Sequence, residues 1–158
     1  APSEKLEVCG NLKVIGTINA SGVINASQAI SCSSDLRFKK NIHALNNSLN
    51  NILSLRGVNY DWKTAEFPQK NFSTGNQIGF IAQEIEKIYP EVVLTDKDGY
   101  KSVDYSRLTP VLVEAIKELK IENDNLKAAI KQQQIINGEQ KTDIEKIKQQ
   151  MGITSEKK

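Results

Sequence analysis

A long heptad pattern near the C-terminus limits what this chain can fold into. Apolar or amide side chains recur at alternating steps of three and four residues, which places them along one side of a helix. We define the seam as Leu112, Ile116, Leu119, Asn123, Leu126, Ile130, Gln133, Asn137, Gln140, Ile144, Ile147 and Met151. A helix this long outruns a domain of this size. The pattern therefore predicts a coiled coil between chains.

The residue types in the seam bear on the number of helices. The seam alternates between the a and d positions of the heptad. Isoleucine at both, as at Ile144 (a) and Ile147 (d), favours a coiled coil of three helices over one of two. Asn123 and Asn137 lower stability but specify the register, because a buried amide needs an amide partner on the next helix. We expect a homotrimer with a parallel helical bundle over residues 108–158. The alternative is a single amphipathic helix packed on its own domain.

Residues 34–107 carry shorter patterns, typical of a small globular domain. Steps of three and four residues between apolar side chains predict helices, and short apolar or alternating runs predict strands. The predicted elements are helices over 43–55 and 83–89, strands over 58–62 and 78–82, and a hairpin over 92–105 that turns at Asp98-Gly99. Ser106 is the expected N-cap of the long helix, with Pro110 tolerated near its first turn.

This mixture predicts an α+β fold, in which a small globular domain lies between an N-terminal segment and the long helix. We expect the hairpin and the strand over 78–82 to form one sheet. Trp62, Phe80 and Tyr105 should be largely buried, because large aromatic side chains in strands usually carry the core.

Residues 1–33 alternate apolar and small polar side chains between glycines, which predicts short strands and turns. The sequence Ile-Asn-Ala-Ser occurs at 18–21 and again at 24–27. Short repeats of this kind cannot bury their apolar side within one chain and need neighbouring copies. We therefore expect a β-rich stalk wound together with the same segment of other chains. The alternative is a flexible linker.

Charge and composition argue against several classes of function. Lys and Arg number 21 against 19 for Asp and Glu, so a net charge of +2 does not suggest a binder of nucleic acid or of membrane surfaces. No apolar run approaches the roughly 20 residues that cross a bilayer. Cys9 and Cys32 are expected to be small buried thiols, and His43 an ordinary residue near a helix start. We expect no metal and no cofactor.

Ser34 and Lys39 lie five positions apart, where the predicted stalk meets the globular domain. A lysine that is partly stripped of water can lose its proton and activate a hydroxyl, so this pair is a candidate Ser-Lys dyad. Both residue types are common, and Ser34-Asp35 would serve equally well as an N-cap or a turn. Spacing alone leaves catalysis and a structural turn both open.

Several motifs in order resemble the endosialidase-type intramolecular chaperone family. Its members lie at the C-terminus of phage tailspikes, tail fibres and some bacterial surface proteins, and within the myelin regulatory factor. The resemblance covers roughly residues 33–127. The motifs are Ser-Asp-x-Arg-x-Lys with Asn-Ile at 34–42, Ile-Gly-Phe-Ile-Ala-Gln-Glu-Ile-Glu at 78–86, Pro-Glu-Val-Val at 90–93, Val-Asp-Tyr at 103–105 and Glu-Ala-Ile-Lys-Glu-Leu at 114–119.

The resemblance implies an intramolecular chaperone that trimerises a fibre or spike protein and then releases itself by autoproteolysis. Ser34 would be the nucleophile and Lys39 its general base. Ser33 would lie beside the cut, with Asp35 and Arg37 as positioning residues. The implied partners are two identical chains and the upstream fibre segment of the same chain. The implied location is a virion tail fibre or spike, or a bacterial cell surface, after synthesis in the host cytoplasm.

The scissile bond and the occurrence of cleavage stay open at this point. Attack by Ser34 on the preceding carbonyl passes through a five-membered ring, whereas attack on its own carbonyl needs a strained four-membered lactone. A cut at the Ser34–Asp35 junction, where the family is usually described as cleaving, therefore requires attack from a neighbouring chain or by water. The alternative function is a non-cleaving trimerisation or capping module of a structural or adhesive fibre. A DNA-binding regulator, which one relative is, is disfavoured by the near-neutral charge.

Overall fold

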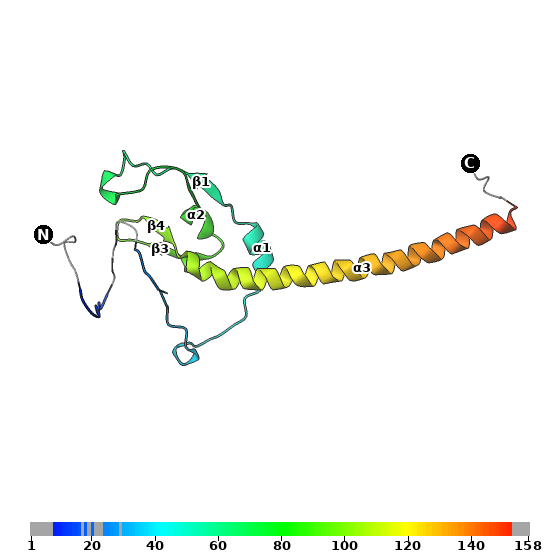
Figure 1. Ribbon diagram of the computed structural model, residues 1–158, viewed down its shortest axis with the longest axis horizontal. Coiled ribbons are helices and arrows are strands. Elements are labelled where there is room, and N and C mark those ends of the chain that lie inside the picture. The colour runs from blue at the N-terminus through cyan, green and yellow to red at the C-terminus, as the bar shows by residue number, and fades with distance from the viewer. Residues whose placement is uncertain (1–7, 17, 19, 21–23, 29, 153–158) are drawn as a thin grey trace. The chain divides into compact units, whose positions relative to one another are not determined.

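The computed structural model describes residues 8–16, 18, 20, 24–28 and 30–152. The chain divides into two compact units, residues 1–41 with 59–79 and residues 42–58 with 80–158. Small two-stranded sheets combine with a long C-terminal helix, which confirms the α+β class. The helices and strands, coloured along the chain in Figure 1, are α1 (Ser48–Leu53), β1 (Val58–Tyr60), β2 (Gln77–Gly79), α2 (Ala82–Ile85), β3 (Val93–Thr95), β4 (Lys101–Val103) and α3 (Leu108–Gln150).

The predicted hairpin is confirmed. Strands β3 and β4 are antiparallel, with Val93 opposite Val103. The Asp96 carboxylate closes the turn by accepting hydrogen bonds from the backbone N–H groups of Asp98 and Tyr100, at 2.9 and 2.8 Å. Gly99 has a φ of +85°, a conformation that glycine adopts without the steric cost of a Cβ.

The expectation of a single sheet is wrong. Strand β2 pairs with β1, and the hairpin forms a second sheet of its own. The expected buried strand over 78–82 ends at Gly79, and Ile78 is 84% exposed. A two-stranded sheet has only one partner per strand and no covering layer on both faces, so an apolar residue in it can face solvent.

The core lies in the second unit, where α2, the hairpin and the start of α3 meet. Its buried members are Ile85, Val92 and Leu108, and Ile85 is only 1% exposed. Partly buried side chains complete this cluster, namely Leu55, Phe80, Tyr89, Val93 and Val103. Each element contributes few apolar residues, so the core forms only when all of them pack together.

The expected burial of three aromatic residues is wrong for two of them. Trp62 lies beyond the end of β1 and is exposed, with its ring stacked on Phe72 at 4.1 Å between centroids. Tyr105 is 51% exposed because it lies in a 3-10 turn before α3, stacked at 5.9 Å on Phe80, which is itself partly buried. Its Oη accepts a hydrogen bond from the Phe80 N–H at 3.0 Å, which ties the two segments together.

Two helix boundaries also differ from expectation. Helix α1 begins at Ser48 because Asn47 has a φ of +58°, which is incompatible with a right-handed helix. The cap before α3 is Asp104 rather than Ser106. The Asp104 carboxylate accepts from the Ser106 N–H at 3.1 Å and caps the 3-10 turn Tyr105–Arg107 that leads into α3.

No strand occurs among the described residues of 8–33, and their side chains are all exposed. A strand needs a neighbour to pair its N–H and C=O groups, and the structure holds one chain. The stalk and the domain boundaries at residues 33 and 107 therefore stay predictions. Cys9 and Cys32 are both exposed, so the expectation of buried thiols is wrong.

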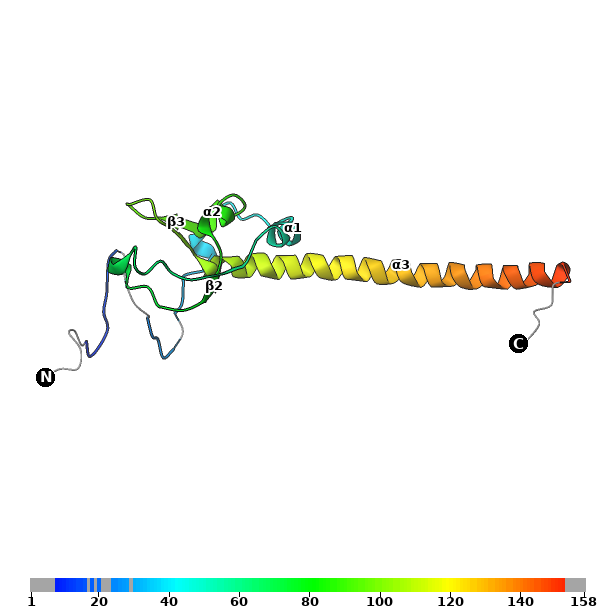
Figure 2. The same ribbon diagram turned by 90° about the horizontal axis from the view of Figure 1, so that it is seen from above.

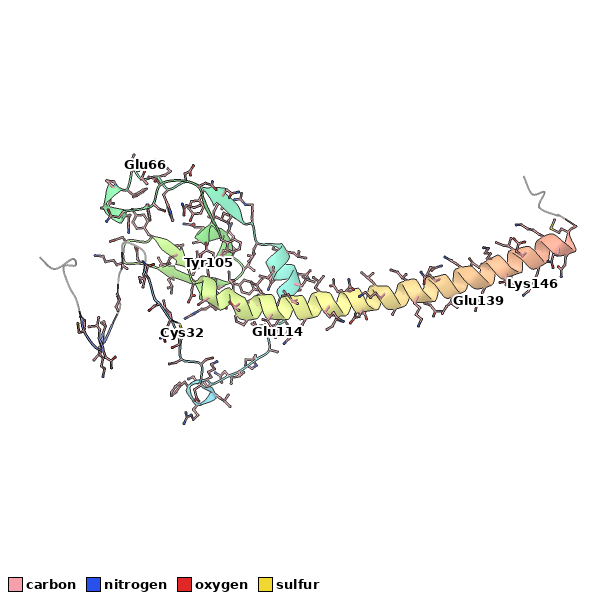
Figure 3. The ribbon with its side chains drawn as sticks, viewed as in Figure 1. Cys32, Glu66, Tyr105, Glu114, Glu139 and Lys146 are labelled. Atoms are coloured by element: carbon pink, nitrogen blue, oxygen red, sulfur yellow. The ribbon has the colours of Figure 1, made fainter. Side chains whose placement is uncertain are left out.

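Helix α3 divides into a packed start and an exposed remainder. Leu108, Val111 and Ala115 are buried, and α1 lies beside this start in both views (Figures 1 and 2). All seam residues are exposed, and Figure 3 shows side chains such as Glu139 and Lys146 pointing into open space. Successive residues lie about 100° apart around a helix. The buried stripe at 111 and 115 is therefore offset from the seam at 112 and 116, and packing within one chain leaves the seam uncovered.

Among the described residues, no helix is long and apolar enough to cross a membrane.

The core predicts a sharp contrast between two isoleucines. We expect Ile85→Ala to lower the free energy of unfolding by about 2–5 kcal/mol, because it leaves a cavity in a small core. Ile78→Ala is the matched control and should change it by less than about 0.5 kcal/mol, because that side chain is already in water. Chemical denaturation of both variants at one protein concentration measures the difference. Equal losses for the two would contradict the core described here.

Candidate functional site

A short 3-10 turn carries the Ser-Asp-x-Arg-x-Lys motif. The 3-10 helix η1 (Leu36–Phe38) is capped by Asp35, whose Oδ1 accepts from the Arg37 N–H at 2.9 Å. The Arg37 side chain donates two further hydrogen bonds to the same carboxylate, from Nε at 3.0 Å and from Nη2 at 2.9 Å. Backbone bonds from Phe38 to Asp35 and from Lys39 to Leu36 close the turn. Asp35 and Arg37 are thus joined by three hydrogen bonds within the turn.

The turn brings the two candidate catalytic side chains together. Lys39 follows η1 in an extended conformation, with φ −113° and ψ 143°. This conformation lets its side chain reach back, and Lys39 Nζ donates a hydrogen bond to Ser34 Oγ at 2.7 Å. A nucleophile and its base must lie within about 2.6–3.2 Å for proton transfer, and this pair meets that condition.

Charge within the turn is locally balanced. Hydrogen bonds from the Arg37 side chain, and then from its backbone N–H, lower the pKa of the Asp35 carboxyl below its ordinary value. The same pairing raises the pKa of Arg37. Asp35 therefore stays a carboxylate that is occupied by Arg37, and Lys39 is left to Ser34.

The site is exposed in the single chain. Ser34 and Lys39 lie in solvent, as does Ser33, which directly precedes them. Two apolar neighbours are also exposed, Leu36 at 70% and Phe38 at 76%. They occupy the two positions at which the motif Ser-Asp-x-Arg-x-Lys specifies no residue type, so the motif does not mark them as functional. Their signal in the sequence was their apolar character beside a polar dyad.

Among the described residues, no cluster of His, Cys, Asp and Glu is arranged to hold a metal ion.

The paired turn makes a prediction about pH. A carboxyl whose pKa is lowered in the folded state stabilises the turn above its ordinary pKa, and that stabilisation is lost as the pH falls through the lowered value. Arg37→Ala should therefore move the pKa of Asp35 back toward its ordinary value. The remaining backbone bond should keep part of the shift. An NMR titration of the Asp35 carboxyl, with Lys40→Ala as the control, measures this. An unchanged Asp35 titration in Arg37→Ala would exclude the pairing in solution.

Part of the chain matches a known family. Residues 34–94 match the family model named Peptidase S74 and described as the chaperone of endosialidase. The match begins at Ser34 itself and extends into β3, so it covers the dyad, α1, the first sheet and α2. The resemblance inferred from the ordered motifs is confirmed over this range, which is shorter than the span of the motifs. Residues 34–94 are therefore similar to the endosialidase-type chaperone domain.

Proposed function

We propose that this chain is an intramolecular chaperone that trimerises a fibre or spike protein and then releases itself by cutting next to Ser34. The observation that carries the proposal is the 2.7 Å hydrogen bond between Lys39 Nζ and Ser34 Oγ, at the first residue of the chaperone domain. A family that is named both as a peptidase and as a chaperone supports the two halves of this function.

The chemistry needs only the two side chains and water. An uncharged Lys39 amine takes the proton of the Ser34 hydroxyl while Oγ attacks a peptide carbonyl carbon. The tetrahedral intermediate collapses by breaking its C–N bond, and the Lys39 ammonium returns the proton to the leaving amine. Water then hydrolyses the ester that remains and regenerates the hydroxyl. Attack on the Ser33 carbonyl uses a five-membered ring within the chain, whereas the Ser34–Asp35 bond requires a Ser34 from another chain or water.

Assembly supplies the condition that the single chain lacks. A hydrated ammonium has no lone pair with which to accept a proton, and Lys39 is exposed. Leu36 and Phe38 are exposed beside it and provide apolar surface for a neighbouring copy to cover. Burial against such surface favours the uncharged amine. Cleavage should therefore follow assembly.

Early trimerisation would help a slow folding step. Stalks of interwoven chains bury surface only after three chains align, so their nucleation is slow and prone to traps. The seam of α3 would join the chains first and raise the effective concentration of their stalk segments. Removal of the chaperone afterwards would leave a fibre with high kinetic stability, because the easy route back to the unfolded state is gone.

The proposed partners are two further copies and the upstream stalk of the same chain, and the proposed setting is a virion tail fibre or spike, or a bacterial surface. A non-cleaving trimerisation or capping module is the competing function, and the experiment below separates them.

The dyad predicts a specific pattern of cleavage. Ser34→Ala should abolish cleavage without loss of trimers, because removing an exposed hydroxyl costs little stability. Lys39→Ala should slow cleavage by about 100-fold or more, because it removes the general base. The matched control Lys40→Ala should cleave like wild type. Mass spectrometry of chains expressed with the upstream stalk measures the extent of cleavage and identifies a new N-terminus at Ser34 or at Asp35. Wild-type trimers that stay intact, or a Ser34→Ala variant that still cuts, would leave only the capping module.

The exposed seam predicts assembly and its link to cleavage. Sedimentation should show a trimer at micromolar concentration. Leu126→Pro should weaken the trimer because proline breaks α3 within the seam, at a cost of about 3 kcal/mol or more per chain. Cleavage should fall with it, although the residue lies far along the sequence from Ser34. A wild-type monomer, or full cleavage in a monomeric Leu126→Pro variant, would refute this link.

A further inference from the structure

Charged side chains lie along both edges of the seam on α3. When the a and d positions of a heptad form the seam, the e and g positions lie beside it on opposite edges. The e positions are Lys120, Lys127, Gln134, Lys141 and Lys148. The charged g positions are Glu122 and Asp143. One edge therefore carries only positive charge and the other only negative charge, which makes the two edges complementary.

The direction of neighbouring helices decides which edges meet. In parallel helices at the same height, a g residue faces the e residue five positions later on the neighbour. Glu122 then faces Lys127 of the next copy, and Asp143 faces Lys148. In antiparallel helices the like edges meet, so lysines would face lysines at a cost in stability. The charges beside the seam therefore favour parallel helices in register.

Contacts within the chain distinguish one of these pairs. Glu122 and Lys127 are exposed, and neither forms a hydrogen bond or an ion pair with a residue that the structure describes. Lys120, one heptad earlier than Lys127, forms an ion pair with Asp124 of its own helix. The residue that would face Lys120 on a neighbour is Ala115, which is uncharged and already buried. Lys120 thus has its partner within the chain, whereas Lys127 is left free opposite a glutamate.

The other lysines of this edge lack that combination. Asp143 and Lys148 each hold an ion pair within the chain, with Lys146 at 2.9 Å and with Glu145 at 3.0 Å. A contact between chains would have to compete with these pairs. Lys141 has no ion pair within the described part of the chain, but it would face an apolar g residue. Lys127 is therefore the one lysine of this edge that is free and also faces an acid.

We propose that Glu122 and Lys127 select the partners of α3, with each Glu122 paired to Lys127 of the next copy around a parallel trimer. This inference rests on the proposed trimer and adds the chemistry by which a chain accepts identical copies in register. A single exposed ion pair stabilises little. Three such pairs form together here, and a wrong partner or direction meets like charges instead, so the main effect is on specificity.

Charge reversal in the full chain tests this pairing. Glu122→Lys should raise the protein concentration at which the trimer half-dissociates by about tenfold or more, because lysine then faces lysine at every contact between helices. Lys127→Glu should do the same with glutamates. The double variant restores opposite charges and should return to within about threefold of wild type. Sedimentation at low ionic strength measures all four chains, and added salt should narrow the differences.

Glu139→Lys is the matched control. Glu139 is another exposed glutamate of α3 without an ion pair among the described residues, and its side chain points into open space (Figure 3). It occupies a c position, away from the seam. The same change of charge there should alter the half-dissociation concentration by less than about twofold.

Mixing two chains tests recognition separately from stability. Wild-type and doubly reversed chains, unfolded together and refolded, should form separate trimers, because each contact between unlike chains places like charges opposite one another. Native mass spectrometry counts the mixed trimers. A random mixture, a double variant no better than the single ones, or a Glu122→Lys trimer tighter than wild type would overturn the inference and leave the trimer standing. A monomeric wild type would instead refute the trimer itself, and the inference with it.

Discussion

The second unit of this protein depends on what packs against the first turns of α3. Leu108 joins the core with Ile85 and Val92, and Ala115 is buried farther along the helix. Glu118 adds two charge-assisted hydrogen bonds to α1. Such bonds are stronger than bonds between neutral groups. Neither α1 nor a two-stranded hairpin is stable by itself, so both depend on this part of the helix.

The same helix serves contacts within the chain and offers others outside it. The stripe used by the core and the exposed seam lie on different sides, so one does not compete with the other. A core with so few buried side chains yields modest stability. In the proposed trimer, the seam would add apolar burial that the single chain lacks. Folding of the domain and assembly of the chains would then stabilise one another.

At the candidate site, Ser34 and Lys39 lie at hydrogen-bond distance, but both are exposed to solvent. The Asp35–Arg37 turn places Lys39 Nζ next to Ser34 Oγ without help from a second chain. The exposure of both residues keeps the lysine hydrated. In the proposed self-cleavage, the two side chains already lie at a suitable distance, and burial of the lysine on assembly is the remaining change.

Sequence alone determined those features that are encoded locally. The heptad period required a long helix, Asp98-Gly99 required the hairpin turn, and five positions across a capped turn brought Ser34 and Lys39 into contact. Ordered motifs were enough to find the similarity of residues 34–94 to the endosialidase-type chaperone family. These features depend on residues close in the chain, whose geometry is limited by backbone sterics and hydrogen bonding.

Tertiary structure alone decided the rest. It paired β2 with β1 instead of the hairpin, left Trp62 and Tyr105 exposed, and capped α1 with Glu118 from far along the chain. Such outcomes follow from competition among distant segments for a small core and for unpaired backbone groups. The spacing of apolar residues within a short stretch of sequence does not reveal this competition, because the competing segments come together only when they pack around α3.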